Sequence, residues 1–217
     1  MSAGFAAYVA HELRTPLATQ RALLELTLSD PAADVATWRE VGESVLGACG
    51  HQERLVEACL TLARSKCGPQ RRERIDLAEI ANQALRDHDL SELERVVELR
   101  PAMACADRGL VERLVANLVS NAIRHNVTPG RIEVTTRATA RHSVVSVANT
   151  GPRIPARDLQ RLFQPFQRLG ANPRTFNDGV GLGLAIVRAI AVAHDATVRA
   201  HARASGGLGV DVAFPAI

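Results

Sequence analysis

The first part of the chain carries a hydrophobic pattern with the period of an α-helix. Leu13, Leu17, Gln20 and Leu24 follow one another at intervals of three or four residues, and Thr27 or Leu28 continues the series. Positions spaced in this way lie on one face of a helix, and this stripe is wide enough to pack against more than one neighbour. The run Ser29-Asp30-Pro31 interrupts it. The sequence therefore predicts a long helix that ends at this turn.

A second long helix is expected over residues 34–65, where the same spacing returns. Its stripe consists of Val45, Cys49, Gln52, Val56, Cys59 and Ala63, widened by Leu55 and Leu62. Two helices joined by a short turn cannot bury two such stripes by themselves. We therefore expect two copies of this antiparallel hairpin to form a four-helix bundle, which makes the protein a homodimer.

Structure-breaking and charged residues separate the hairpin from the rest of the chain. The segment Cys67-Gly68-Pro69-Gln70-Arg71-Arg72 has the composition of a linker. We expect a helical hairpin over residues 1–67, a linker over residues 68–72 and a second domain over residues 73–217.

Strand and helix patterns alternate in the second domain. Strands are expected at Ile75 and over residues 96–99, 104–106, 131–139, 143–148, 197–202 and 209–214. Helices are expected over residues 77–88, after an N-cap at Asp107, and over residues 182–194. Residues 152–180 show few periodic signals, and loops of such length are usually functional. The fold class is therefore α+β, with a helical hairpin followed by a domain of alternating strands and helices.

Composition narrows the functional class. The chain has 217 residues, 47% of them hydrophobic, which is enough for one or two domains with buried cores. Its net charge of +3 is small and the basic residues are spread, so no nucleic-acid partner is expected. No apolar run approaches the ~20 residues of a membrane span, and no signal peptide is evident. Four cysteines without a CxxC pair indicate reduced thiols in the cytoplasm.

Residues 9–19 place a histidine, an acid and a hydroxyl on one helical stretch. Thr15 lies four residues after His11 and shares its face of the helix, while Glu12 flanks the histidine. Pro16 cannot donate a hydrogen bond to the carbonyl of Glu12, so we expect a bend one turn beyond His11. An imidazole in this setting is a candidate nucleophile.

Two further segments are suited to phosphate. The side-chain amides of Asn117 and Asn121 face the same way on a helix, and an amide oxygen is a suitable ligand for Mg²⁺ that bridges phosphates. Gly179, Gly181 and Gly183 stand at alternate positions. Glycines let the backbone approach phosphates closely, and a helix that begins near Gly183 offers free N–H groups and a positive dipole end.

In this order, the motifs resemble the signature boxes of the sensor histidine kinases of two-component systems. Residues 9–19 resemble the H-box, residues 117–126 the N-box, residues 149–155 the first glycine box and residues 178–188 the second. The resemblance runs from about Phe5 to Pro215. It implies that the second domain is the α/β sandwich of the GHKL type, shared by histidine kinases, gyrase-type ATPases, Hsp90 and MutL, with an ATP lid over residues 152–180.

The resemblance also implies a role for each matched residue. His11 would attack ATP through one ring nitrogen, and Glu12 would accept the proton of the other. Thr15 matches the position that orients water for dephosphorylating a partner regulator; alternatively, it only completes the helix. Asn117 and Asn121 would hold Mg²⁺. The other residues expected at ATP are Arg124, His125, Asn149, Gly151, the lid residue Arg168, Gly179, Gly181 and Gly183.

The same resemblance implies partners and a location. A homodimer would pass its phosphoryl group to an aspartate in the receiver domain of a response regulator. Only ten residues precede His11, whereas histidine kinases usually carry a sensor and often membrane helices there. The chain is therefore expected to be the cytoplasmic core of a longer sensor, in contact with a membrane only through missing N-terminal segments.

One position separates kinases from hydrolases within this superfamily. The ATP-hydrolysing members have a glutamate one helical turn before the metal-binding asparagine, where it activates water. Here the residue is Asn117, which cannot take a proton. Attack by water is therefore disfavoured, and transfer to an imidazole is the better interpretation.

Two departures from the family pattern keep a second hypothesis open. Asn149 stands where the family has an aspartate that accepts from the adenine amino group, and Arg153 replaces a glycine in the same box. A degenerate kinase that acts as a dimeric scaffold or regulator-binding module is the alternative. In an active kinase, a flipping Asn149 amide would relax discrimination between ATP and GTP; otherwise it simply replaces the aspartate with some loss of affinity.

Overall fold

The computed structural model describes residues 3–66, 68–69, 71–167 and 181–217. These residues form two compact units. The first contains the helical hairpin as far as Leu60, and the second contains the described residues from Thr61 onward.

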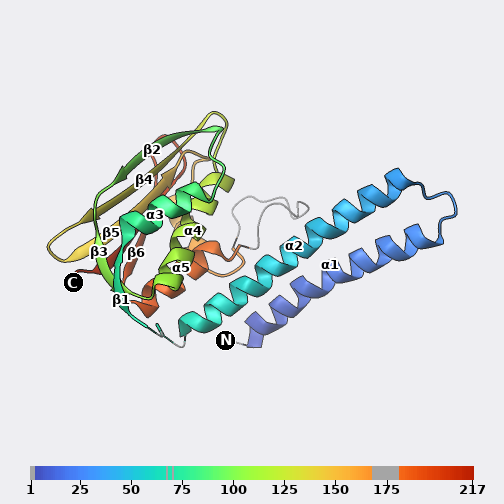
Figure 1. Ribbon diagram of the computed structural model, residues 1–217, viewed down its shortest axis with the longest axis horizontal. Helices are drawn as coiled ribbons and strands as arrows, with labels where there is room; N and C mark the ends of the chain where they lie inside the picture. Colours follow the sequence, from blue (N-terminus) through green and yellow to red (C-terminus); the bar gives the residue numbers. More distant parts are fainter. Residues whose placement is uncertain (1–2, 67, 70, 168–180) are drawn as a thin grey trace. The chain divides into compact units, whose positions relative to one another are not determined.

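The first unit is the predicted hairpin of two antiparallel helices, α1 (Ala3–Ser29) and α2 (Val35–Lys66) (Figure 1). At the turn, the Asp30 carboxylate accepts a hydrogen bond from the backbone of Ala32. The Asp34 carboxylate accepts from both the backbone N–H and the hydroxyl of Thr37, each at 2.8 Å, which begins α2. These hydrogen bonds to Thr37 lower the pKa of Asp34 below its usual value.

The wide hydrophobic stripe of the hairpin is divided between buried and exposed positions. Gln20 and Leu55 are buried, but Leu17, Leu28 and Val56 expose 56%, 72% and 45% of their surface. The exposed positions are consistent with the prediction that one hairpin cannot bury both stripes by itself. A single pair of helices can cover only one side of so wide a stripe. Further exposed hydrophobic side chains on the hairpin are Tyr8, Leu26, Val35, Trp38, Leu46 and Leu60.

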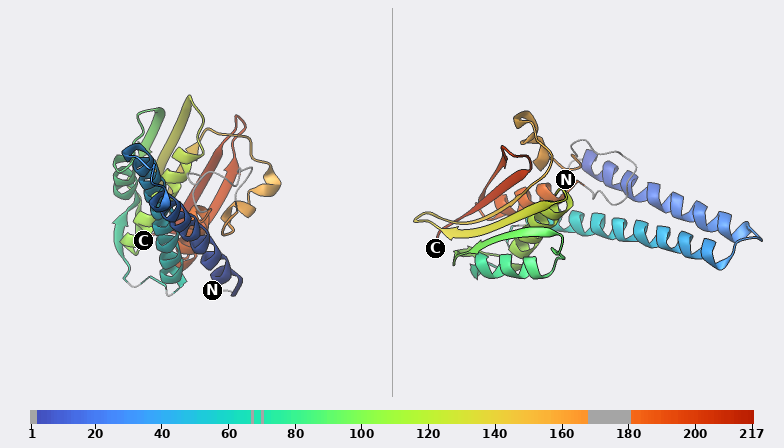
Figure 2. Two further views of the ribbon diagram at one scale, coloured as in Figure 1. Left: turned by 90° about the vertical axis from the view of Figure 1, so that its right-hand side faces the viewer. Right: turned by 90° about the horizontal axis from the view of Figure 1, so that it is seen from above.

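The second unit is built on a five-stranded sheet with three helices on one face (Figures 1 and 2). The strand order is β2-β4-β5-β7-β6; β2 pairs with β4 in parallel, and the other pairs are antiparallel. The strands are β2 (Leu93–Leu99), β4 (Gly130–Ala138), β5 (His142–Asn149), β6 (Thr197–Ala202) and β7 (Leu208–Pro215). The helices are α3 (Leu77–Arg86), α4 (Arg108–Arg124) and α5 (Gly183–Ala193). A separate two-stranded sheet joins β1 (Glu73–Asp76) to β3 (Met103–Ala106).

Most of these elements occupy the predicted ranges, and the largest difference is in β2. This strand begins at Leu93 instead of Val96, because it continues as a partner of β4 as far as the Leu93–Gly130 pair. It lies at the edge of the sheet and its interior positions are exposed, so its side chains do not alternate in polarity. In the predicted lid, the described part contains two short 3₁₀ helices, η1 (Ala156–Asp158) and η2 (Arg161–Phe163).

A buried histidine joins the end of α5 to the beginning of α4. His194 is only 2% exposed, and its Nδ1 lies 2.8 Å from the carbonyl oxygen of Ile190. Its Nε2 accepts a hydrogen bond of 3.0 Å from the backbone N–H of Asp107, the residue that caps α4 as predicted. Because Nε2 is the acceptor, the ring is neutral and Nδ1 donates to Ile190. His194 thereby fixes where the helix that carries Asn117 and Asn121 begins.

We predict that His194→Ala destabilises the second unit by about 2–4 kcal/mol. The substitution removes two buried hydrogen bonds, leaves the Asp107 N–H without its partner and creates a cavity. Chemical denaturation followed by circular dichroism measures the effect. The control is His142→Ala, at an exposed position, for which a change within about 0.5 kcal/mol is expected. Equal stability of the two variants would contradict a structural role for His194.

Candidate functional site

The histidine of the first motif lies exposed on α1. Its neighbour Glu12 is half-buried, and no hydrogen bond joins the two side chains in the described part of the hairpin. Thr15 donates from Oγ1 to the backbone carbonyl of His11 at 3.1 Å, and Thr19 makes the same contact with Thr15 at 3.2 Å. The imidazole of His11 is therefore accessible, while the Thr15 hydroxyl is bound to its own helix backbone.

Pro16 is buried within α1, and the helix continues past it to Ser29. Two glutamines connect the helices nearby. Gln52 of α2 donates to the carbonyl of Leu13 at 3.2 Å, one residue after the Glu12 carbonyl that Pro16 leaves without its usual partner. Gln20 of α1 donates to the side-chain oxygen of Gln52 at 3.3 Å. The backbone beside His11 is thus tied to α2 through a polar pair within the hairpin core.

The contact between Gln20 and Gln52 predicts that their contributions to the stability of the hairpin are coupled. Gln52→Leu alone removes the oxygen that accepts from the Gln20 amide and the amide that donates to the Leu13 carbonyl, so it destabilises the hairpin by about 1–3 kcal/mol. Gln20→Leu together with Gln52→Leu removes both partners and fills the space with apolar groups, so the double variant loses less stability than the two single variants summed. Thermal unfolding of all four proteins measures the coupling. Strict additivity would show that the two glutamines act independently.

A second cluster forms where α4 approaches the first turn of α5. Asn117 and Asn121 are both half-buried on α4. Asn117 donates from Nδ2 to the carbonyl of Arg113 at 2.7 Å, which leaves its Oδ1 available. A Cβ atom placed on Gly183 would lie 2.9 Å from Nδ2 and 3.0 Å from Oδ1 of Asn121. A side chain at position 183 would therefore force the Asn121 amide to shift away from the α5 N-terminus.

The end of β5 completes this cluster. Asn149 is 5% exposed, and its Nδ2 donates to the carbonyl of His125 at 3.2 Å and to that of Thr150 at 2.6 Å. A Cβ atom on Gly151 would lie 2.6 Å from the same His125 carbonyl. The residues predicted from segments 117–126 and 149–155, although distant in sequence, are therefore neighbours in the second unit.

Two glycines at this site were not predicted. Gly206 and Gly207 form the turn between β6 and β7 with φ angles of 94° and 99°, which favour glycine. A side chain on Gly207 would overlap the carbonyl of Asn149, and one on Gly206 would overlap that of Gly151. The local signal was the run Ser205-Gly206-Gly207 before a strand, but nothing in the sequence indicates which segment it packs against.

Hydrogen bonds and an ion pair hold the surrounding loops. The Thr150 hydroxyl donates to the side-chain oxygen of Asn126 at 2.6 Å and accepts from the backbone of Arg131 at 2.8 Å. Near the β6–β7 turn, Arg203 and Glu133 form an ion pair in which a guanidinium nitrogen lies 2.6 Å from a carboxylate oxygen. The hydrogen bond from Arg203 lowers the pKa of Glu133.

The remaining predicted residues lie at the margin of this cluster or outside the described chain. Arg124 and His125 are exposed at the end of α4. Gly181 has a positive φ of 70°, and its carbonyl accepts from the backbone of Phe166 at 2.8 Å. Arg168, Gly179 and most of the second half of the predicted lid lie outside the described residues.

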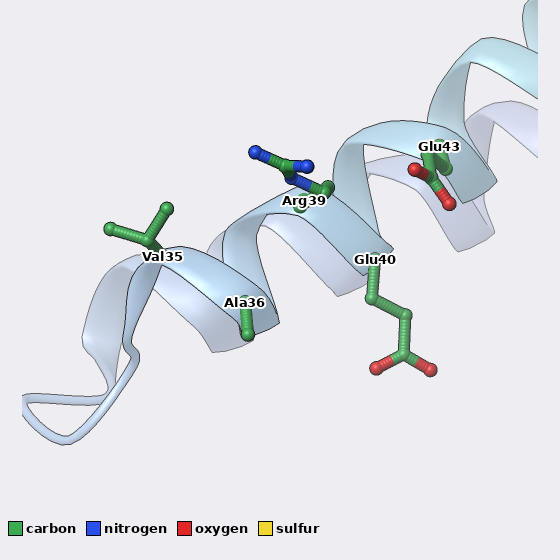
Figure 3. A pocket seen from close by; sticks show the side chains of 5 residues that line it. All are labelled: Val35, Ala36, Arg39, Glu40 and Glu43. Atoms are coloured by element: carbon green, nitrogen blue, oxygen red, sulfur yellow. The ribbon is translucent and has the colours of Figure 1, made fainter.

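Outside this cluster, the described residues give little evidence of a further functional site. A shallow depression at the start of α2 is lined by Val35, Ala36, Arg39, Glu40 and Glu43. Figure 3 shows Arg39 and Glu40 pointing to different sides of the helix, so these side chains do not converge on one point. No described helix is long and apolar enough to cross a membrane. Within the described ranges, no group of three or more His, Cys, Asp or Glu side chains is arranged to bind a metal ion.

Two family models match the chain. Residues 1–68 match the His Kinase A (phospho-acceptor) domain, and residues 106–216 match the Histidine kinase-, DNA gyrase B-, and HSP90-like ATPase. A phosphoacceptor hairpin followed by this ATPase domain defines the class of histidine kinases. With these two matches, the chain belongs to the two-component sensor histidine kinases, a family of ATP-dependent protein-histidine kinases.

Individual relatives agree with this assignment. The sensor protein CutS of Streptomyces coelicolor is 41% identical over 216 residues, covering 97% of this chain and 52% of CutS. The chain thus spans about half the length of the curated relatives it matches. A solved structure of the mycobacterial sensor histidine kinase MprB, with 25% identity, has a TM-score of 0.59, and the match covers 67% of this chain and 97% of the solved chain. Histidine kinase ThkA, solved with the response regulator protein TrrA, has a TM-score of 0.75 at 21% identity, covering 99% of this chain and 62% of that one.

Proposed function

We propose that this chain phosphorylates itself on His11 with ATP bound to its second domain. The observation that carries the proposal is the close approach of Asn121 to Gly183, which sets a side-chain amide beside the N-terminus of α5. Free N–H groups and the positive end of the helix dipole attract phosphate at this point. The accessible His11, with Glu12 beside it, supplies the acceptor imidazole.

The donor set of this cluster fits Mg²⁺. The described residues around it supply amide oxygens and no group of carboxylates, and the Oδ1 atom of Asn117 is available. Mg²⁺ accepts one or two protein ligands when substrate phosphates and water complete its shell, and it neutralises phosphate charge when bound. Asn117 and Asn121 would hold the ion, while Arg124 and His125, exposed at the end of α4, would contact phosphate oxygens.

The residues available to accept a proton favour phosphoryl transfer to a histidine over phosphoryl transfer to water. Asn117 has no basic atom, and its NH₂ group is already bound to the carbonyl of Arg113. It therefore cannot activate water. On α1, Glu12 would accept the proton of the ring nitrogen that does not attack, which fixes the tautomer and makes the other nitrogen a better nucleophile.

The exposed hydrophobic positions on the hairpin support a dimer. Leu17, Leu46, Val56 and Leu60 are all more than 40% exposed on one chain. Packing against a second hairpin would bury such side chains in a four-helix bundle. The phosphoryl group would then pass from His11 to an aspartate of a response regulator, and the regulator present with ThkA supports this partner class. A chain that uses ATP would act in the cytoplasm, as the cytoplasmic part of a longer sensor.

Regulator dephosphorylation through Thr15 is a further part of the proposal, although the Thr15 hydroxyl is bound to the His11 carbonyl. That hydroxyl could orient water only after turning away from its own helix. The alternative interpretation, a degenerate kinase that serves as a dimeric scaffold, rests on Asn149 and Arg153 and predicts a different result in the labelling experiment below.

Incubation with γ-labelled ATP and Mg²⁺ tests the main proposal. We expect label on the protein that is lost in acid and stable in base, as a phosphoramidate is, and no label in His11→Gln. The matched control is His142→Gln, which changes another exposed histidine and should label normally. Undiminished labelling of His11→Gln would refute His11 as the acceptor, and an unlabelled wild type that still binds ATP would favour the scaffold.

We also predict that Asn121→Ala abolishes Mg²⁺-dependent labelling while the dimer persists. The substitution removes an amide from the second unit and leaves the hairpin core unchanged. Light scattering reports the oligomeric state and labelling reports activity on the same sample. Gln83→Ala, which removes an exposed amide from α3, is the control and should retain both properties. Near-normal labelling of Asn121→Ala would exclude Asn121 as the metal ligand.

A further inference from the structure

Gln52 of α2 contacts α1 on both sides of Pro16. Its Nε2 donates to the backbone carbonyl of Leu13, before the proline, at 3.2 Å. Its Oε1 accepts from Nε2 of Gln20, after the proline, at 3.3 Å. The Gln20 amide also lies 3.4 Å from the Val45 carbonyl of α2. One side chain of α2 therefore connects the two parts of α1 that the proline separates.

Pro16 is the point at which the backbone of α1 fixes its own direction least. A proline has no N–H, so the carbonyl four residues earlier loses its usual partner, and the ring pushes that carbonyl aside. Helices kink at such positions, and also where a side chain enters the ladder of backbone hydrogen bonds. Gln52 enters the ladder at Leu13, within one turn of the proline. The course of α1 beside His11 thus depends on α2 as well as on its own backbone.

Packing alone does not require glutamine at these two positions. Gln20 is only 8% exposed, and its neighbours on α2 include the buried apolar residues Ala48 and Leu55. Apolar contacts have no preferred direction, so they fix the position of one helix against another only loosely. A hydrogen bond from an amide to a carbonyl requires a particular distance and angle. A buried polar pair therefore specifies one arrangement of the two helices.

We propose that Gln52 is a positioning residue for the phosphorylation of His11. This inference rests on the proposed kinase function and deepens it. His11 lies two residues before Leu13, in the same turn of α1, so the direction of the helix at Leu13 determines where the imidazole lies. In-line phosphoryl transfer requires close alignment, and a displacement of about 1 Å costs up to about 100-fold in rate. Gln52 would act on the reaction through the α1 backbone.

Three variants separate positioning from stability. Gln52→Leu loses the contacts with both Leu13 and Gln20. Gln52→Glu keeps an oxygen that accepts from Gln20 and loses the N–H group that reaches Leu13. Gln20→Leu with Gln52→Leu places apolar groups at both positions and, as predicted above, loses less stability than the two single variants summed. This double variant still lacks the hydrogen bond to Leu13.

The experiment measures the initial rate of His11 labelling against ATP concentration, together with calorimetric titration of ADP and light scattering. We expect all three variants to be labelled about tenfold more slowly than the wild type at saturating ATP. The KM for ATP and the affinity for ADP should stay within about twofold, because the proposed nucleotide site lies in the second unit. The variants should remain dimers.

Two controls accompany these variants. Leu55→Val removes buried apolar volume from the hairpin and leaves the hydrogen bonds of Gln52 unchanged, so it should lower thermal stability while labelling stays near the wild-type rate. Gln83→Leu makes the same chemical change on the exposed surface of α3 and should match the wild type in every measurement.

Several results would overturn the inference and leave the kinase proposal intact. One is a wild-type rate in Gln52→Glu or in the double variant, and another is equal slowing by Leu55→Val, which would show that hairpin stability governs labelling. A raised KM for ATP or weaker ADP binding would place the effect outside the hairpin, with the same consequence. If Gln52→Leu does not fold, the double variant and Gln52→Glu decide the question. A wild type that is not labelled on His11 would instead contradict the proposed function itself.

Discussion

The close approach of α4 and α5 is the contact on which the proposed site depends. The two helices belong to sequence segments about sixty residues apart, yet the Asn121 amide lies against the backbone of Gly183. A methyl group at position 183 would displace the Asn121 amide from the first turn of α5, where the proposed site binds phosphate. At the C-terminal end of α5, His194 accepts a hydrogen bond from the backbone N–H of Asp107, the N-cap residue of α4. The two helices are thus fixed to each other at both ends.

Much of the fold could be predicted from local patterns. The stop at Ser29-Asp30-Pro31, the cap at Asp107 and the strand alternation of β4 and β5 all depend on residues near one another in sequence, and each is present in the structure. The edge strand β2 was predicted too short, because its extent is set by pairing with β4 and its exposed side chains carry no alternation. The helical stripe was predicted to be too wide for one hairpin to bury, and a single chain buries only part of it.

The residues of the candidate site also divide into those that a local motif predicts and those that depend on contacts distant in sequence. Asn117, Asn121 and Gly183 could be found from the sequence because each lies in a short motif whose spacing expresses a local geometry. Gly206 and Gly207 could not, since their role is to leave room for the Asn149 and Gly151 carbonyls, which are more than fifty residues away. The orientation of the Asn149 amide is of the same kind. It depends on the direction of the His125 carbonyl, which is set by the end of α4.

The two carbonyl oxygens that bind the Asn149 amide belong to the main chain, which limits how substitutions can alter this part of the site. A side chain that fixes a neighbour can be lost in one substitution, but a peptide carbonyl is present whatever residue occupies positions 125 and 150. No single exchange at either position deletes the acceptor that the amide requires. A hydrogen-bond donor at position 149 is therefore matched by the path of the backbone, whichever side chains stand at positions 125 and 150.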